Sequence, residues 1–205
     1  MTLGGNAVLL SFSLILHSQI FFLLLPLKNL KTKIMRRIFL IGFMGAGKTT
    51  IGKELSSQMN LSFIDLDHFI ENRYHKTIRQ IFEEKGEDAF RDMEQKTLRE
   101  VAEFEEVVIS TGGGTPCFHQ NMLFMNEKGT TVYLKVSIEE LIKRITLHKN
   151  VRPVLQGLSG NELNLFVEEI IAKRNPYYEQ SHIIFNAETS DISTLCKRLN
   201  KEIVK

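Results

Sequence analysis

The chain has 205 residues, of which 43% are hydrophobic and 24% are charged, a balance that fits one α/β domain with a sizeable core. The formal net charge of +2 is close to neutral, so no broad electrostatic field indicates a nucleic-acid partner. Cys117, Cys196 and the six histidines form no metal-binding pattern, which argues against a protein-built transition-metal site and predicts reduced thiols in a cytoplasmic protein.

The first 34 residues differ from the remainder. Residues 7–27 are almost wholly apolar and long enough to cross a bilayer, but the absence of a preceding Lys or Arg disfavours a secretory signal peptide. The segment is either a membrane anchor, whose following basic residues keep the rest of the chain in the cytoplasm, or an extension upstream of a true start at Met35. We favour Met35, because it immediately precedes the first predicted strand. The predicted working domain is then residues 35–205, with membrane contact only if residues 7–27 are retained.

Residues 42–49 read Gly-Phe-Met-Gly-Ala-Gly-Lys-Thr and satisfy the G-x-x-x-x-G-K-[ST] spacing of a phosphate-binding loop. The apolar residues 37–41 before it predict a buried parallel strand, and residues 49–59 after it have a helical period. Backbone N–H groups of the loop and the helix N-terminus would bind phosphate. Lys48 would reach the β- and γ-phosphates of ATP and the Thr49 hydroxyl would ligate Mg²⁺. The alternative is a glycine-rich turn that binds nothing.

The remainder of the chain alternates strands and helices, which predicts a parallel sheet of five strands flanked by helices. Further strands are expected at residues 61–65, 107–110, 130–136 and 183–185. Helices are expected at residues 69–74, 78–84, 87–104, 119–127, 137–147, 161–181 with a break at Pro176, and 192–204. Core-facing positions in residues 87–104 include Phe90, Leu98 and Phe104. Residues 148–160 read as a mobile loop.

Four groups of residues are expected at the carboxyl ends of these strands or above them, where ligands of such sheets bind. Asp65 and Asp67 could serve a metal ion and an acceptor hydroxyl, although Asp67 could instead be a helix N-cap. Arg91 could bind an anion or form a surface or intrahelical ion pair with Glu94. The glycines at residues 112–114 indicate a close approach of backbone to a ligand. Arg152 could close over phosphates or remain a solvated loop residue.

The chain resembles the shikimate kinase family from residue 35 to roughly the last helix, because several of the family's motifs occur here in the same order. The matching elements are the loop at residues 42–49, Asp65-Leu-Asp67, Phe90-Arg91 with Glu94, the glycines at 112–114, Arg152-Pro153, and Arg174 with Tyr177 or Tyr178 and Glu179. The resemblance implies a P-loop NTPase-type fold, like that of nucleoside monophosphate kinases, with a lid loop. It also implies phosphorylation of the 3-hydroxyl of shikimate by ATP with Mg²⁺, in aromatic amino acid biosynthesis. We expect a monomer.

The same resemblance assigns roles to individual residues. Catalysis is assigned to Lys48, Asp67 and Arg152, with Asp67 first an orienter of the acceptor hydroxyl and second its base. ATP would contact Gly45, Ala46, Gly47, Lys48, Thr49, Thr50 and Arg152. Shikimate would contact Asp67, Arg91, Gly113, Gly114 and Arg174. Mg²⁺ would be held by Thr49 and, through water, by Asp65.

Some features depart from the family pattern or leave other functions open. Residues 115–117 replace a plainer small-apolar pair, and Arg144 is only a loose match to the arginine near the adenine. A related kinase, such as a gluconate kinase, would share the phosphate loop without the arginine pair. A membrane-tethered nucleotide-binding regulatory module is suggested only by residues 7–27.

Overall fold

The computed structural model describes residues 36–147 and 160–203. The chain divides into two units, residues 1–34 and residues 35–205, and all described residues belong to the second. The apolar segment at 7–27 and the predicted lid with Arg152 and Pro153 therefore lie outside the described residues. Within 36–147 and 160–203, no helix combines the length and apolar character needed to cross a bilayer.

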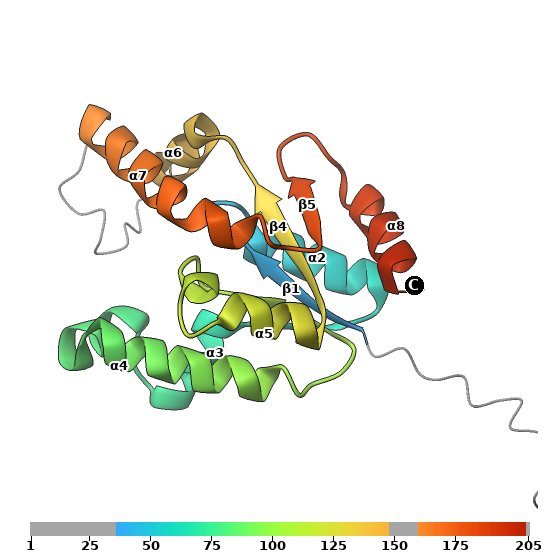
Figure 1. The fold of residues 1–205 in the computed structure, drawn as a ribbon, viewed down its shortest axis with the longest axis horizontal. Coiled ribbons are helices and arrows are strands. Elements are labelled where there is room, and N and C mark those ends of the chain that lie inside the picture. Colours follow the sequence, from blue (N-terminus) through green and yellow to red (C-terminus); the bar gives the residue numbers. More distant parts are fainter. Residues whose placement is uncertain (1–35, 148–159, 204–205) are drawn as a thin grey trace, which may run out of the picture. The chain divides into compact units, whose positions relative to one another are not determined.

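The described part of the chain contains a sheet of five parallel strands in the order β2-β3-β1-β4-β5, of which Figure 1 labels β1, β4 and β5. The five parallel strands confirm the sequence prediction, which did not include their order. The strands are β1 (Arg37–Ile41), β2 (Ser62–Asp65), β3 (Val107–Ser110), β4 (Thr130–Lys135) and β5 (Ile183–Asn186). Asp65 pairs in register with Ser110, and Ser110 pairs with Leu40. The segments that follow β2, β3 and β1 therefore leave the sheet side by side.

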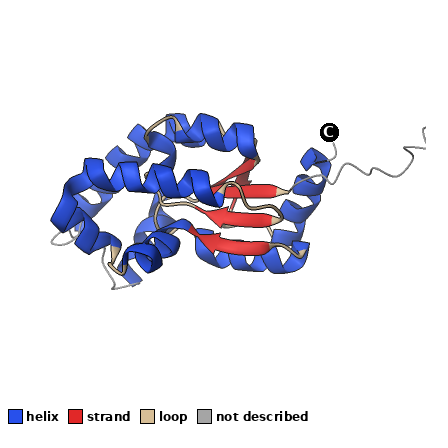
Figure 2. Cartoon of the chain, turned by 90° about the horizontal axis from the view of Figure 1, so that it is seen from below, coloured by secondary structure: helices blue, strands red, loops and turns tan. Residues whose placement is uncertain are grey.

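Helices cover both faces of the sheet (Figure 2). They are α2 (Lys48–Met59), α3 (Leu66–Tyr74), α4 (Ile78–Val101), α5 (Asn121–Lys128), α6 (Ile138–Leu147), α7 (Gly160–Tyr178) and α8 (Ile192–Ile203), with a short 3₁₀ turn, η1 (Thr115–Cys117). Because both faces are covered, every residue of β1 and β3 is buried, which explains their continuous apolar runs.

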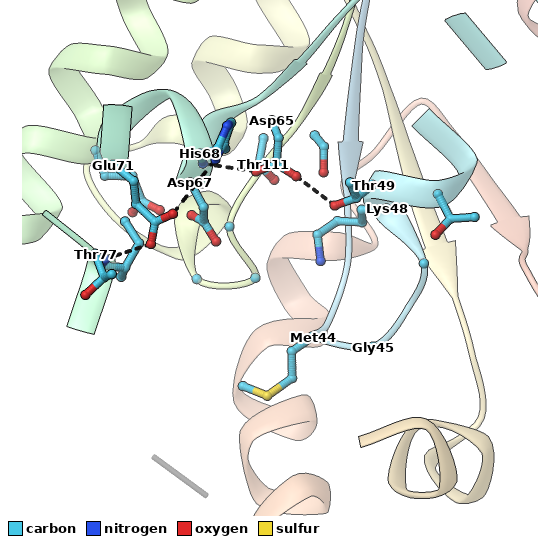
Figure 3. Close-up of a pocket in the computed structure, with 18 of the residues that line it drawn as sticks. Met44, Gly45, Lys48, Thr49, Asp65, Asp67, His68, Glu71, Thr77 and Thr111 are labelled. Atoms are coloured by element: carbon cyan, nitrogen blue, oxygen red, sulfur yellow. Dashed lines mark hydrogen bonds and ion pairs between the residues drawn. The ribbon is translucent and has the colours of Figure 1, made fainter. Parts of the chain in front are cut away.

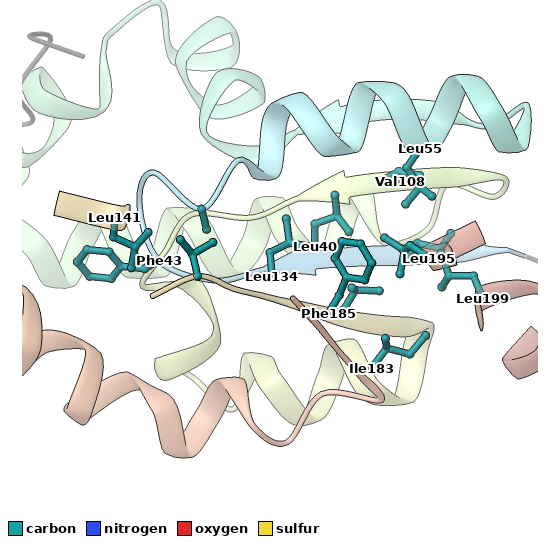
Figure 4. Packing of buried hydrophobic residues seen from close by; sticks show 14 of the residues in the cluster. Leu40, Phe43, Leu55, Val108, Leu134, Leu141, Ile183, Phe185, Leu195 and Leu199 are labelled. Carbon is teal, nitrogen blue, oxygen red and sulfur yellow. The ribbon is translucent and has the colours of Figure 1, made fainter. Parts of the chain in front are cut away.

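Alternate residues of β1 enter two separate apolar layers. Ile38 and Leu40 pack with α2, α6, α7 and α8, the layer seen in Figure 4. Phe39 and Ile41 face the layer formed mainly by α3, α4 and α5. This follows from the two-residue period of a strand. The central strands are thereby fixed from both sides, and so are the loops at their carboxyl ends.

Several helix boundaries differ from the sequence predictions. Helix α3 begins at Leu66, earlier than expected, because the Asp65 side chain accepts a hydrogen bond from His68 N–H and caps it. The suggestion that Asp67 is the N-cap was therefore wrong. Thr77 caps α4 as predicted. The predicted stop at Gly86 is also confirmed, because Gly86 has non-helical angles (φ 81°, ψ 174°) and forms a kink at which two helices meet within Ile78–Val101.

Two other expectations were wrong near helix C-termini. Phe104 is 46% exposed because α4 ends at Val101, so the periodicity of the helix no longer directs Phe104 toward the core. Pro176 does not break α7, which continues to Tyr178. A proline lacks an N–H donor but retains helical φ, and here only two residues follow it before the helix ends.

Candidate active site

A cavity of about 1290 Å³ is lined by the phosphate loop and by residues that follow β2 and β3. Lys48 lines it from the loop, Arg91 from α4 and Arg174 from α7. Asp65, Asp67 and the glycines at residues 112–114 also line it. Figure 3 shows Lys48 and Thr49 together with Asp65 and Asp67 in this pocket. The structure therefore brings the phosphate loop and both arginines predicted to bind the acceptor to one cavity.

The loop between β1 and α2 has the geometry of an anion site. Gly47 is the N-cap of α2 with φ of 90°, a conformation that a residue with a Cβ adopts only with strain. Lys48 Nζ donates to the carbonyls of Gly42 at 2.8 Å and Phe43 at 2.9 Å, which holds the ammonium over the loop. The first N–H groups of α2 and this ammonium offer positive charge to phosphate oxygens.

The other residues predicted to contact ATP differ in exposure. Gly45, Gly47, Thr49 and Thr50 line the cavity, whereas Ala46 is 1% exposed, so that only its backbone is suited to contact phosphate. Arg144, the loose match for an adenine contact, lines the cavity from α6 and donates to Gly45 O at 3.3 Å. Arg152 cannot be placed, because it lies outside the described residues.

Thr49 and Asp65 together form a pair of oxygen donors beside the phosphate loop. The Thr49 hydroxyl donates to Asp65 Oδ2 at 2.7 Å, and Oδ1 of the same carboxylate accepts from His68 N–H at 3.3 Å (Figure 3). A hydroxyl and a carboxylate are hard oxygen ligands of the kind that Mg²⁺ prefers. Their chemistry and proximity therefore fit a magnesium ion bound next to the phosphates.

Asp67 lies in the first turn of α3 and is directed toward the glycine segment. A Cβ added at Gly112 would lie 2.9 Å from Asp67 Oδ1 and 2.9 Å from Glu94 Oε1. Two carboxylates, from α3 and α4, therefore approach the same backbone. Asp67 of α3 lines the cavity together with Arg91 and Glu94 of α4.

Arg91 is only 8% exposed although its helix is otherwise amphipathic. Its Nη1 donates to Glu94 at 2.9 Å and its Nη2 donates to Glu87 at 2.9 Å. The guanidinium carbon also lies 4.2 Å from the centre of the Phe118 ring. The intrahelical ion pair considered from the sequence is present, but it is buried in the cavity wall and not at the surface.

Glu94 is the buried hydrogen-bond partner of Arg91. It is 1% exposed, and its Oε1 accepts a hydrogen bond of 2.5 Å from the Thr115 hydroxyl. Burial raises the pKa of Glu94, while the Arg91 charge and the Thr115 hydroxyl oppose that rise. Thr115 and Phe118 were not among the predicted site residues. Their contacts depend on the turn after β3, and the only sequence signal was the unusual composition of residues 115–117.

The glycine segment lies between the two arginines. An added Cβ at Gly114 would lie 2.7 Å from Arg91 Nη2, and one at Gly113 would lie 3.3 Å from Arg174 Nη1. A side chain at Gly114 would displace the Arg91 guanidinium, so glycine at this position lets the backbone lie close to it. Gly113 and Gly114 thus line the cavity beside the two arginines, and their contact with a substrate stays a prediction.

A family model described as shikimate kinase matches residues 44–204 of this chain. The chain belongs to the shikimate kinase family. The shikimate kinase of Parabacteroides distasonis is 59% identical over 171 residues, covering 82% of this chain and 99% of that protein. The shikimate kinase of Phocaeicola vulgatus is 51% identical over 175 residues, covering 82% of this chain and all of that protein.

Solved shikimate kinases share the fold over most of the chain. The crystal structure from Bacteroides thetaiotaomicron has a TM-score of 0.77 and 49% identity, covering 83% of this chain and 99% of that one. The enzyme from Acinetobacter baumannii, solved in complex with shikimate, has a TM-score of 0.72 and 32% identity over 83% of this chain and 93% of that one. A gluconokinase from Sinorhizobium meliloti, with 12% identity and a TM-score of 0.50, shares the fold alone.

Proposed function

We propose that the protein transfers the γ-phosphoryl group of ATP to the 3-hydroxyl of shikimate, giving shikimate 3-phosphate and ADP, as a step of aromatic amino acid biosynthesis. The observation that carries the proposal is the convergence of Lys48, Arg91 and Arg174 on one cavity. One cavity can then hold a triphosphate and an acceptor that bears a carboxylate. Family membership supports the same reaction, since the matching relatives are named shikimate kinase.

The acceptor side of the cavity suits a carboxylate that also bears hydroxyls. We assign Arg91 and Arg174 to the carboxylate, because planar guanidinium groups bind carboxylates with two parallel hydrogen bonds. Asp67 would accept a hydrogen bond from the ring hydroxyls and orient the 3-hydroxyl. The N–H groups of Gly113 and Gly114 would donate to the same substrate. The Asp67 carboxylate on one side of shikimate and the two arginines on the other would fix the orientation of the substrate.

In the reaction the 3-hydroxyl oxygen forms a bond to the γ-phosphorus as the bond from that phosphorus to the β,γ-bridging oxygen breaks. The hydroxyl proton passes to Asp67, which is first an orienting group because the transition state is loose and needs little base assistance. Lys48 stabilises the negative charge on the transferring group, and we assign the same role to Arg152. Positioning and electrostatics supply most of the acceleration.

We assign the magnesium ion to Thr49 and Asp65, whose oxygens lie 2.7 Å apart beside the phosphate loop. When bound, Mg²⁺ supplies positive charge that neutralises phosphate oxygens. The protein's contribution is to hold the two oxygen donors at fixed positions on α2 and at the end of β2. Asp65 is held additionally through its hydrogen bond to His68 N–H.

We further propose that residues 35–205 form the kinase, as a cytoplasmic monomer, and that residues 1–34 take no part in the reaction. Support comes from the division of the chain at residue 34 and from the family match over residues 44–204. A chain expressed from Met35 tests this directly. We expect it to remain in the supernatant and to retain the turnover of the full chain, and activity that needs residues 1–34 would contradict the proposal.

The function is tested by a coupled assay that follows ADP release with shikimate, with gluconate and with no acceptor. We expect turnover with shikimate and only background with the other two, and ³¹P NMR should identify a phosphomonoester at the 3-position. Preference for gluconate would favour the related sugar-acid kinase. Nucleotide binding without turnover on either acceptor would favour a regulatory module and would overturn the proposal.

A further inference from the structure

Two adjacent tyrosines near the end of α7 have different environments. Tyr177 is 39% exposed, whereas Tyr178 is completely buried. The Tyr178 hydroxyl donates a 2.5 Å hydrogen bond to the carbonyl of Gly113, which lies 65 residues earlier in the chain. The sequence left open which tyrosine belongs with Arg174, and only Tyr178 reaches the glycine segment at the cavity.

The Tyr178 ring is held firmly in this position. It packs against the Tyr133 ring at 5.0 Å between centroids, and the Tyr133 hydroxyl donates to Asn175 at 3.1 Å in the same helix. Burial raises the pKa of Tyr178, so its hydroxyl remains protonated at neutral pH and acts as the donor. The nearby charge of Arg174 lowers this pKa to a smaller extent. Tyr178 is therefore a fixed donor between α7 and the glycine segment.

The hydrogen bond to Gly113 has a geometric consequence for the next residue. The carbonyl of Gly113 and the N–H of Gly114 belong to one planar trans peptide, in which they point in opposite directions. Holding the carbonyl toward Tyr178 therefore turns the Gly114 N–H away from Tyr178. Gly114 is also the residue that lies against the Arg91 guanidinium. The orientation of this one peptide thus affects both a backbone donor and the surroundings of Arg91.

Arg174 belongs to the same arrangement. It lies one helical turn before Tyr178 in α7, so the two side chains share a helix face. Arg174 Nη1 lies 3.3 Å from the position of a Cβ added at Gly113. The hydroxyl of Tyr178 therefore connects α7, which carries Arg174, to the backbone of Gly113 and Gly114. Gly114 in turn lies against Arg91.

We propose that Tyr178 is a positioning residue for the acceptor, a role that rests on the proposed phosphorylation of shikimate. Its hydroxyl fixes the Gly113–Gly114 peptide relative to Arg174, so that the Gly114 N–H and the two guanidinium groups face the same bound carboxylate substrate. Tyr178 acts through these groups and does not touch the substrate itself. Its loss weakens acceptor binding and leaves the ATP side of the cavity intact.

The variant Tyr178→Phe tests this, because it keeps the ring and removes only the hydroxyl. We expect the KM for shikimate to rise about five- to tenfold, the effect of one lost hydrogen bond, while the KM for ATP changes by less than about twofold. Unchanged KM values with a lower melting temperature would show a merely structural role and overturn the proposal. An equal rise in both KM values would also overturn it.

A matched control is available in the neighbouring residue. Tyr177→Phe removes an exposed hydroxyl that does not reach Gly113. This variant is expected to keep the wild-type KM for shikimate, and a rise similar to that of Tyr178→Phe would contradict a specific role for Tyr178. Wild-type protein that does not turn over shikimate would overturn the proposed function and this inference together. Active wild-type protein with no selective effect of Tyr178→Phe would overturn the inference alone.

A measurement on wild-type protein keeps the inference testable if Tyr178→Phe does not fold. In ¹⁵N–¹H spectra, added shikimate is expected to shift the amide signal of Gly114 and to leave that of Gly129 unchanged, since Gly129 lies at the opposite end of β4 beside Arg37. In folded Tyr178→Phe at saturating shikimate, the Gly114 shift is expected to be smaller. A Gly114 signal that does not respond to shikimate in the wild type would overturn the proposal.

Discussion

The Thr49 hydroxyl donates a 2.7 Å hydrogen bond to Oδ2 of Asp65, and Oδ1 of that carboxylate caps helix α3 through His68 N–H. One side chain therefore joins the phosphate loop to the helix that carries Asp67. It combines two roles, a proposed part in holding Mg²⁺ and a local part in starting α3. A substitution at Asp65 must separate these roles before its effect on catalysis can be interpreted.

Asp65→Asn makes this separation, because asparagine caps helices about as well as aspartate but lacks the negative charge. We expect the free energy of unfolding to change by less than about 0.5 kcal/mol. The activity at low Mg²⁺ should fall about 10- to 100-fold, with a higher Mg²⁺ concentration needed for half-maximal rate. Asp65→Ala, which loses the cap as well, should cost about 1 kcal/mol more in unfolding free energy. Wild-type Mg²⁺ dependence in Asp65→Asn would exclude the proposed metal role.

Phe118 stacks on the buried guanidinium of Arg91 at 4.2 Å, and Phe118→Leu removes the ring but keeps apolar bulk. Cation–π contacts contribute about 0.5–2 kcal/mol, so the Kd for shikimate should rise about two- to thirtyfold, as measured by calorimetry. Phe118→Tyr retains an aromatic face and should restore binding. Phe124→Leu is the matched control, since Phe124 stacks at 4.4 Å on Arg99, which does not line the cavity, whereas Arg91 does. An equal loss in Phe124→Leu would refute a specific effect on Arg91.

Burial raises the pKa of Glu94, so the folded protein holds its proton more tightly than the unfolded chain. Its contribution to the free energy of unfolding should be full below the ordinary carboxyl pKa of about 4.3 and should decrease as the pH rises. Glu94→Gln cannot titrate and serves as the reference. The stability of wild type relative to Glu94→Gln should decrease with rising pH by at most about 1.4 kcal/mol per pH unit, as measured by urea denaturation. A relative stability that increases with pH would show that the Arg91 charge lowers the pKa of Glu94 by more than burial raises it.

The sequence was informative where one local pattern decides the structure. The apolar runs at residues 37–41 and 107–110 predicted buried parallel strands, and the loop at 42–49 required a strand before it and a helix after it. Asp65 and the glycines at 112–114 could be placed because Asp65 ends β2 and the glycines come shortly after β3. The rule that ligands bind at the carboxyl ends of parallel strands then predicted their common location.

Other features depend on contacts between distant residues and could not be read from a local pattern. Asp65, and not Asp67, caps α3, which depends on where β2 ends. Only the folded protein distinguishes Tyr178 from Tyr177, through burial and the hydrogen bond to Gly113, because the sequence left open which of them belongs with Arg174. Phe118 had no recognisable signal, because its partner Arg91 lies 27 positions earlier in the sequence and meets it only through the turn after β3.

Arg91 and Arg174 are assigned to the carboxylate of the acceptor, in the cavity that also holds ATP. Comparing kcat/KM for shikimate and for its neutral methyl ester tests this assignment. Two charge-assisted hydrogen-bonded contacts predict that the wild type prefers shikimate by at least about 100-fold. The Arg91→Ala/Arg174→Ala variant should show a preference below about threefold, with ATP binding retained. A wild-type enzyme that uses the ester as well as shikimate would contradict the account.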